Sequence, residues 1–174
     1  MFEHSTGQMK VVFLLLVRFV LASTLSCCWC DPATPAEARF FVGDQDQRSY
    51  VLVMSDEFDK VGRNFSNGMD SKWTALDTPD NSNDSLEYYQ SKRVTTAFDP
   101  DANVTGMVIT TVKEEYQGKQ FTSGMVQGWN KFCFTGGIVE VRAKMPFGGG
   151  FWPAVWLFGN LGRAVYEPSN ARVW

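Results

Sequence analysis

The stretch from Ser123 to Asn160 constrains the fold more than any other part of the chain. In its sequence, SGMVQGWNKFCFTGGIVEVRAKMPFGGGFWPAVWLFGN, glycine-rich turns separate short extended segments. From Gly137 to Met145, apolar residues alternate with charged ones, so a strand here has one apolar face and one polar face. After the next turn we expect another strand, in which Trp152 and Trp156 share a face. This pattern is typical of a β-sheet rather than of helices.

The rest of the chain adds further short strands. Residues 50–54 and 107–112 are apolar and β-branched, turn-forming residues separate the extended segments, and no segment has a sustained helical period. With 174 residues the chain has room for one domain. The sequence therefore predicts an all-β sandwich over residues 49–174, preceded by a polar linker over residues 31–48, with order beginning at Tyr50.

Residues 1–30 are predicted to be a targeting segment. Lys10 precedes the apolar run Val11–Val17, which Arg18 interrupts. A run of this length fits a cleaved signal peptide better than a membrane span of about 20 residues. The alternative is a short signal anchor that extends to Cys30 and tolerates Arg18; under either interpretation the side that bears Lys10 is expected to stay in the cytoplasm. We therefore expect entry into the secretory pathway, with the domain either lumenal or extracellular, or held by a type II membrane anchor.

Three glycosylation sequons agree with a secretory route. Each has the pattern Asn-X-Ser/Thr and lies in a polar stretch where an acceptor is expected to be exposed. The predicted acceptors are Asn64, Asn83 and Asn103.

Composition excludes several kinds of site. His4 is the only histidine and lies in the targeting segment, so neither a Ser–His–Asp nor a Cys–His site can form in the folded part. Cys27, Cys28 and Cys30 have no second pair at metal spacing, which argues against zinc and leaves acylation or plain leader residues as interpretations. We expect no metal and no cofactor. With a net charge of −3 and no basic stripe, we also expect no nucleic-acid partner.

The two tryptophans after the glycine turn are candidates for binding sugars. Aromatic rings present flat surfaces on which pyranose rings stack. If the face carrying Trp152 and Trp156 lies beside Glu140 and Arg142, the result is an aromatic groove flanked by hydrogen-bonding side chains. The alternative is that both indoles are ordinary core residues.

Candidate catalytic carboxylates are less convincing. Glycoside hydrolysis needs two carboxyl groups on either side of the scissile bond. Asp56, Glu57 and Asp59 form the densest acidic cluster, but their place at a strand end indicates a structural turn. Glu140 is the best-placed single carboxylate, and it has no partner on its own strand.

The motifs SDEFD at 55–59, WNKFCFTGG at 129–137 and GFWPAVWLFGNLGR at 150–163 carry a family resemblance. From about residue 50 to the end, the chain resembles glycoside hydrolase family 16, especially its β-glucan-synthesis branch. The resemblance implies a jelly-roll β-sandwich of the concanavalin A-like lectin/glucanase type, with a concave face for β-glucan. It also implies retaining hydrolysis or transglycosylation by the glutamates of a Glu-x-Asp-x-x-Glu motif.

That catalytic motif is absent from this chain. In the family it lies downstream of GNLGR, so we expect the domain to continue beyond Trp174 and assign no catalytic residue here. The resemblance implies substrate binding by Trp152, Trp156, Arg142 and Asn160. It also implies that Cys133 forms a disulfide with a residue beyond this chain.

Two functional hypotheses follow. The first is the N-terminal part of a glycosidase or transglycosylase acting on β-1,3/β-1,6-glucan in cell-wall or glucan biosynthesis, inactive as this fragment. The alternative is a non-catalytic jelly-roll module that binds β-glucan.

Overall fold

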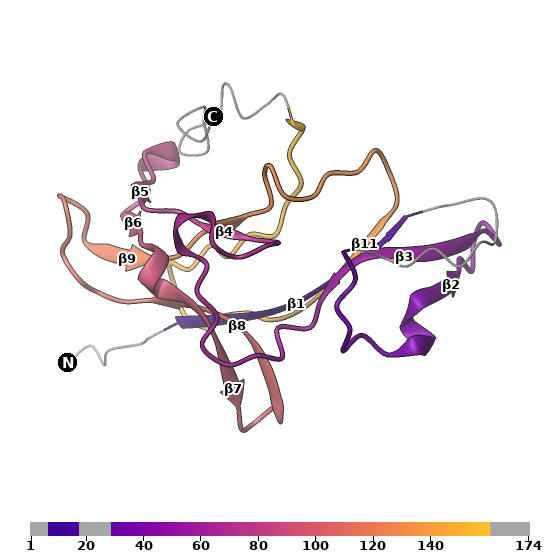
Figure 1. Ribbon diagram of the computed structural model, residues 1–174. Helices are drawn as coiled ribbons and strands as arrows, with labels where there is room; N and C mark the ends of the chain where they lie inside the picture. Colours follow the sequence, from indigo (N-terminus) through magenta and orange to yellow (C-terminus); the bar gives the residue numbers. More distant parts are fainter. Residues whose placement is uncertain (1–6, 18–28, 161–174) are drawn as a thin grey trace.

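The computed structural model describes residues 7–17 and 29–160, and this part of the chain is all-β. Strands alternate with loops and with four short 3-10 turns, and the described residues contain no α-helix (Figure 1). The prediction of an all-β fold is confirmed. The 3-10 turns are η1 (Ala36–Arg39), η2 (Ser66–Gly68), η3 (Ser82–Asp84) and η4 (Ser91–Arg93).

A six-stranded antiparallel sheet forms the largest part of the fold. Its path runs β2-β3-β1-β8-β7, and β11 pairs with β1. Apolar, β-branched residues dominate the longer of these strands, as β propensity requires. The strands are β1 (Gly7–Val17), β2 (Phe40–Val42), β3 (Ser49–Asp56), β7 (Val94–Asp99), β8 (Val104–Thr111) and β11 (Ile138–Lys144).

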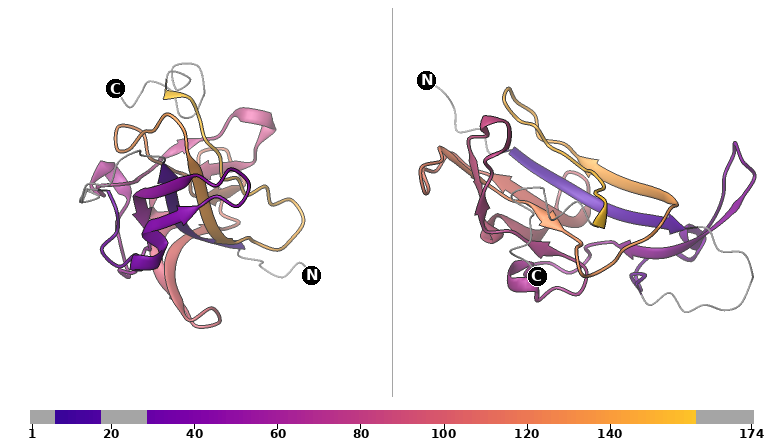
Figure 2. Two further views of the ribbon diagram at one scale, coloured as in Figure 1. Left: turned by 90° about the vertical axis from the view of Figure 1, so that its right-hand side faces the viewer. Right: turned by 90° about the horizontal axis from the view of Figure 1, so that it is seen from above.

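Strand β1 lies in the middle of this sheet and uses both of its edges. One edge pairs with β11 from Lys10↔Lys144 to Leu16↔Ile138. The other edge pairs first with β8, from Gly7↔Thr111 to Val11↔Met107, and then with β3, from Phe13↔Asp56 to Val17↔Val51. The right-hand view of Figure 2 shows β1, in indigo, running beside the orange β11.

The apolar run that was predicted to be part of a leader is therefore an extended strand in this structure. No helix among the described residues is long and apolar enough to cross a membrane. Cleavage of residues 1–30, or their use as an anchor, stays a prediction.

Two smaller sheets lie beside the large one. Strand β10 pairs antiparallel with β4, and β6 pairs antiparallel with β5 and parallel with β9. Their bounds are β4 (Thr74–Ala75), β5 (Thr78–Pro79), β6 (Glu87–Tyr89), β9 (Phe121–Ser123) and β10 (Val126–Gln127).

The stretch 31–48, expected to be a linker, is packed against the end of β3. Asp31 and Thr34 are buried. One carboxylate oxygen of Asp31 accepts a hydrogen bond from the backbone N–H of Glu57 at 3.0 Å, and the Thr34 hydroxyl donates to the Glu57 carboxylate at 2.7 Å. Because η1 and β2 also lie within this stretch, the expectation that order begins at Tyr50 is wrong.

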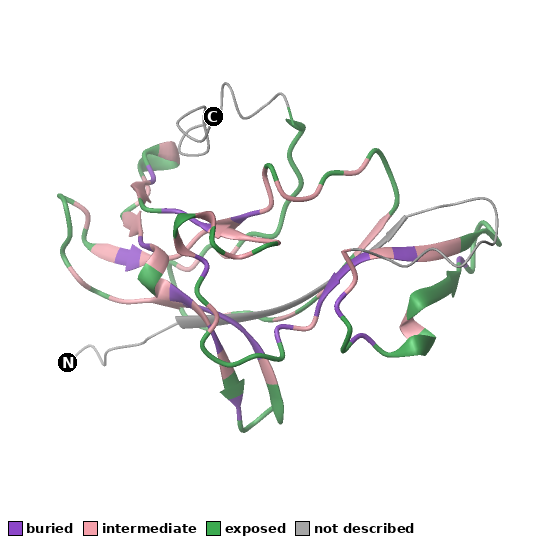
Figure 3. Cartoon of the chain, in the orientation of Figure 1, coloured by how far each residue is buried: buried purple, intermediate pink, exposed green. Residues whose placement is uncertain are grey.

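The core lies between the large sheet and the β4–β10 pair. Figure 3 shows buried positions along β3, β7 and β8, whereas β2 is exposed. Val141 and Ala143 of β11 pack against the buried cluster from its edge. The cluster consists of Phe58, Phe65, Ala75, Val94, Met107 and Ile109.

Candidate functional site

The segment after the glycine turn, which carries Trp152 and Trp156, is not a strand. Residues 151–159 have no regular secondary structure, so the predicted strand is wrong. Alternating side chains favour an extended conformation, but a strand also needs a hydrogen-bonded neighbour. No described strand pairs with this segment, and Pro153 has no N–H to donate.

Both indoles reach the surface of the described structure. Trp152 is 87% exposed and Trp156 is 45% exposed. The alternative that both are buried core residues is therefore wrong in this structure. Arg142 and Asn160, the other two predicted substrate-binding residues, are exposed as well. Their role in binding stays a prediction.

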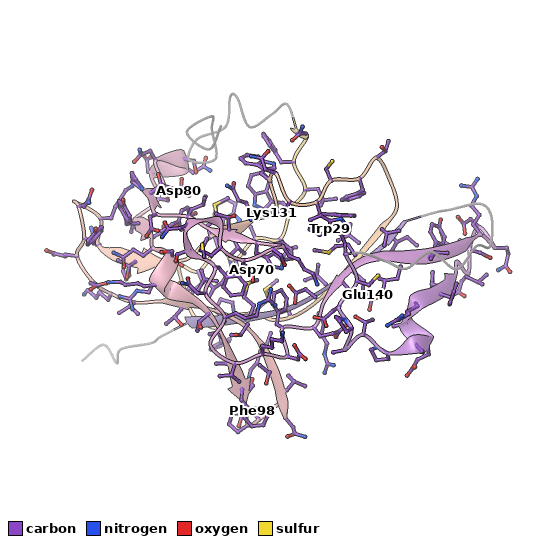
Figure 4. The ribbon with its side chains drawn as sticks, viewed as in Figure 1. Trp29, Asp70, Asp80, Phe98, Lys131 and Glu140 are labelled. Carbon is purple, nitrogen blue, oxygen red and sulfur yellow. The ribbon has the colours of Figure 1, made fainter. Side chains whose placement is uncertain are left out.

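The pocket beside Trp156 lies on the other face of β11 from the one that the predicted groove requires. Trp156 lines a pocket of about 370 Å³ together with Val139 and Val141. These two valines lie on the apolar face of β11, opposite Glu140 and Arg142. Figure 4 labels Glu140 on β11. Trp156 therefore extends the apolar side of the sheet edge rather than its polar side.

Two rings that the sequence argument did not single out join Trp156. The Phe158 ring packs edge-on against Trp156 with ring centroids 5.4 Å apart, and it lies 6.1 Å from the ring of Trp129. Trp129 lies before β11, whereas Trp156 and Phe158 lie after it. Strand β11 and the glycine turn that follows it therefore bring the rings together. We call Trp129, Trp152, Trp156 and Phe158 the aromatic surface.

A lysine fastens the turn that carries Trp129. The Lys131 ammonium group donates to the backbone carbonyl oxygens of Gly68 and Asp70 at 2.9 and 2.8 Å (Figure 4). Within the turn, the N–H groups of Lys131 and Phe132 both donate to the carbonyl oxygen of Gly128. The two bonds from the Lys131 ammonium group tie the turn to the end of η2 and to Asp70 just after it. Sequence spacing held no sign of them, because about sixty residues separate the partners.

Asp56, the last residue of β3 and the first of the acidic cluster, has a structural role. The Asp56 side chain is fully buried and accepts four hydrogen bonds. Both oxygens accept from the Arg63 guanidinium, at 2.6 and 2.9 Å. The backbone N–H of Phe58 and the indole N–H of Trp73 supply the other two. The interpretation as a structural turn is confirmed for Asp56, which has no surface to offer a sugar.

Arg63 joins two carboxylates in one buried network. Its guanidinium also donates to Asp70, and it lies 5.3 and 5.1 Å from the ring centroids of Phe58 and Phe65. Burial acts to lower the pKa of Arg63, but the hydrogen bonds and charges of Asp56 and Asp70 outweigh it and raise the pKa. A permanently charged arginine between two carboxylates stabilises structure and cannot serve as an acid.

Two further carboxylates are also engaged. The hydroxyl groups of Ser82 and Tyr89 each donate to Asp80 at 2.6 Å. Burial tends to raise the pKa of Asp80, but these bonds lower it overall. Glu114 is paired with Arg93, whose hydrogen bond is the main cause of the lowered pKa of Glu114. Neither group is poised to donate a proton near neutral pH.

The predicted modification sites lie at the surface. Asn64, Asn83 and Asn103 are all exposed, and each lies in a loop or turn. Cys133 is exposed, and its thiol is free in this structure. Glycosylation and a disulfide to another part of the protein remain predictions. Within the described residues, no group of three or more His, Cys, Asp or Glu side chains is placed to hold a metal ion.

The chain matches a family model along almost its whole length. Residues 3–174 fit the model described as "Beta-glucan synthesis-associated protein SKN1/KRE6/Sbg1". Beta-glucan synthesis-associated protein KRE6 of Saccharomyces cerevisiae is 34% identical over 178 residues, covering 99% of this chain and 23% of that protein. SKN1 of the same yeast is 40% identical over 149 residues, covering 83% of this chain and 18% of that protein.

A bacterial enzyme is related as well. The beta-glucanase of Rhodothermus marinus is 32% identical over 130 residues, covering 71% of this chain and 42% of that protein. Together with the all-β structure, this relationship confirms the jelly-roll fold class. The chain spans about a fifth of the length of the two yeast relatives, and no solved structure matches it. The chain therefore belongs to the SKN1/KRE6/Sbg1 family of beta-glucan synthesis-associated proteins.

Proposed function

We propose that this chain binds β-glucan in cell-wall or glucan biosynthesis, and that the aromatic surface is where it binds. The observation that carries the proposal is the exposure of two indoles in one segment. Trp152 is 87% exposed, and Trp156, which is 45% exposed, contacts Phe158, whose ring also lies near that of Trp129. Exposed aromatic rings stack on the C–H faces of sugars, whereas a protein without such a ligand leaves few indoles in water. The names of the relatives supply the polymer, because both the yeast proteins and the bacterial enzyme are named for β-glucan.

Apolar stacking is the main interaction on this surface. Trp156 sits beside Val139 and Val141, on the apolar side of β11 rather than on the side that carries Glu140 and Arg142. Binding should therefore depend weakly on salt and strongly on the two tryptophans. Arg142 and Asn160 take a secondary part, as exposed hydrogen-bonding groups at the margin.

We further propose that the full-length protein belongs to a glycoside hydrolase or transglycosylase lineage acting on β-1,3/β-1,6-glucan, and that this chain alone is inactive. The sequence contains no Glu-x-Asp-x-x-Glu motif. Asp56, Asp80 and Glu114 are each engaged in hydrogen bonds or ion pairs that hold them as structural carboxylates. The non-catalytic binding module describes what this chain does by itself.

The test compares Trp152→Ala with Phe40→Ala in binding to a soluble β-1,3/β-1,6-glucan. Phe40 is a matched control because it is 73% exposed but lies on β2, away from the aromatic surface (Figure 1). Truncating a central aromatic contact commonly costs about 2 kcal/mol, so the dissociation constant should rise at least about tenfold for Trp152→Ala. Phe40→Ala should bind as the wild type does.

Affinity electrophoresis in gels containing the glucan measures both variants. Equal retardation of wild type and Trp152→Ala would remove the aromatic surface from the proposal. Incubation of the same glucan with the wild-type chain should release no reducing ends. Release above that of the buffer would contradict the proposed inactivity.

We also propose that the chain enters the secretory pathway, where it is lumenal, extracellular or membrane-anchored. The exposure of Asn64, Asn83 and Asn103 supports this route, because an acceptor asparagine must be accessible. Expression in a eukaryotic host should give a product whose electrophoretic mobility increases after endoglycosidase treatment. Replacing all three asparagines by glutamine should abolish that shift. A wild-type product whose mobility does not change on treatment would count against the secretory route.

A further inference from the structure

Strand β1 joins β11 to β8 and β3, which do not pair with β11 themselves. It is hydrogen-bonded to β11 on one edge and to β8 and β3 on the other. Without it, β3 would keep its pairing with β2, and β8 would keep its pairing with β7. Among the described elements, β11 pairs with β1 alone, so it would lose its whole ladder.

The same residues have a second structural preference. Within Gly7–Val17 the apolar residues form a continuous run, which suits a strand buried on both faces and equally suits a secretory targeting segment. A segment in lipid must satisfy its own backbone groups and therefore becomes helical. In the sheet, the backbone groups of β1 bond to β11, β8 and β3 instead. One copy of the segment cannot do both.

We infer that the position between β11 on one side and β3 and β8 on the other is a strand-acceptor site. Its ligand is an extended strand with the sequence of Gly7–Val17, antiparallel to all three neighbours. In this structure the chain supplies that strand itself. When the segment is engaged elsewhere, the site is open to the same strand supplied by a peptide or by another copy.

Filling this site stabilises more than the backbone of β11. Val141 and Ala143 pack against the buried cluster that contains Val94, Met107 and Ile109. Val139 and Val141 also line the pocket against which Trp156 rests. Unpaired backbone groups at a sheet edge are unfavourable and invite incorrect pairing. Loss of β1 therefore loosens β11, and with it one support of the aromatic surface.

The first measurement is hydrogen exchange in the full chain, comparing Phe13→Pro with Phe13→Val. Position 13 pairs with Val141 on one side and Asp56 on the other. Proline removes a backbone donor from a central strand, whereas valine keeps the donor and favours a strand. Amide protection over residues 138–144 should fall at least tenfold in Phe13→Pro and stay at the wild-type level in Phe13→Val. Unchanged protection in Phe13→Pro would overturn the inference.

The second measurement adds the strand back. A synthetic peptide of residues 7–17 with a solubilising oligolysine tail should restore protection over residues 138–144 of Phe13→Pro in a saturable manner. A scrambled peptide with the same tail should have no effect, and wild type should bind the peptide at least tenfold more weakly because its site is filled. If Phe13→Pro precipitates, the peptide is supplied during refolding and should recover soluble chain. Failure of the peptide in both formats would also overturn the inference. Neither measurement involves glucan, so the proposed function stands or falls separately.

Discussion

Asp56 shows how a sequence motif that looks catalytic can be structural. Its carboxylate is fully buried and bonded to Arg63, Trp73 and the backbone of Phe58. Two neighbouring side chains extend this role, because Ser55 and Glu57 bond to Thr34 in the segment before η1. The SDEFD motif thus connects the segment before η1 to the core at the end of β3.

Breaking this network by Arg63→Met should destabilise the domain severely. The substitution leaves Asp56 as a buried charge without its partner, for which the loss of unfolding free energy is about 3 kcal/mol or more. Urea denaturation followed by tryptophan fluorescence measures the change. The control Arg48→Met removes an exposed guanidinium and should leave the midpoint unchanged. A similar midpoint for both variants would show that Asp56 is satisfied without Arg63.

At the level of elements, strands with a clear pattern in their own residues were the easiest to predict, whatever strand they pair with. Alternation over 137–145 anticipated β11 (Ile138–Lys144), and the β-branched run 107–112 anticipated most of β8. The strand predicted around Trp152 failed because alternation does not specify a hydrogen-bonded partner. The packing of Asp31 and Thr34 was missed because short polar residues that cap a neighbouring strand have the composition of a loop.

The packing of Gly124 against β7 and β8 depends on the absence of a side chain at this position. A Cβ added at Gly124, between β9 and β10, would lie 2.5 Å from Val94 Cγ2 and 3.2 Å from Ile109 Cγ2. Gly124→Ala should therefore overpack the core and lower the unfolding free energy by about 1–3 kcal/mol. Gly136→Ala is the matched control, because nothing lies within 4 Å of its added Cβ. Equilibrium unfolding in urea resolves a difference in unfolding free energy of this size between the two variants. Equal stabilities would mean that β7 and β8 can shift to make room.

At the scale of the whole molecule, the sequence predicted the fold class but not that β1 forms the middle of the largest sheet. Apolar runs predict burial without saying whether protein or lipid does the burying, so Gly7–Val17 was assigned to a leader. Likewise, the aromatic surface could be predicted only in part. Trp152 and Trp156 stood out in the sequence, but Trp129 and Phe158 join Trp156 only once the chain has turned back on itself.

The bonds of Asp31 and Thr34 to the end of β3 also bear on processing. A protease that released the domain by cutting within residues 31–48 would sever these bonds and leave the Ser55 and Glu57 side chains without their partners. A cut ahead of Trp29, which pairs with Met54, would keep these bonds but would separate the domain from β1 and leave β11 without its partner among the described strands.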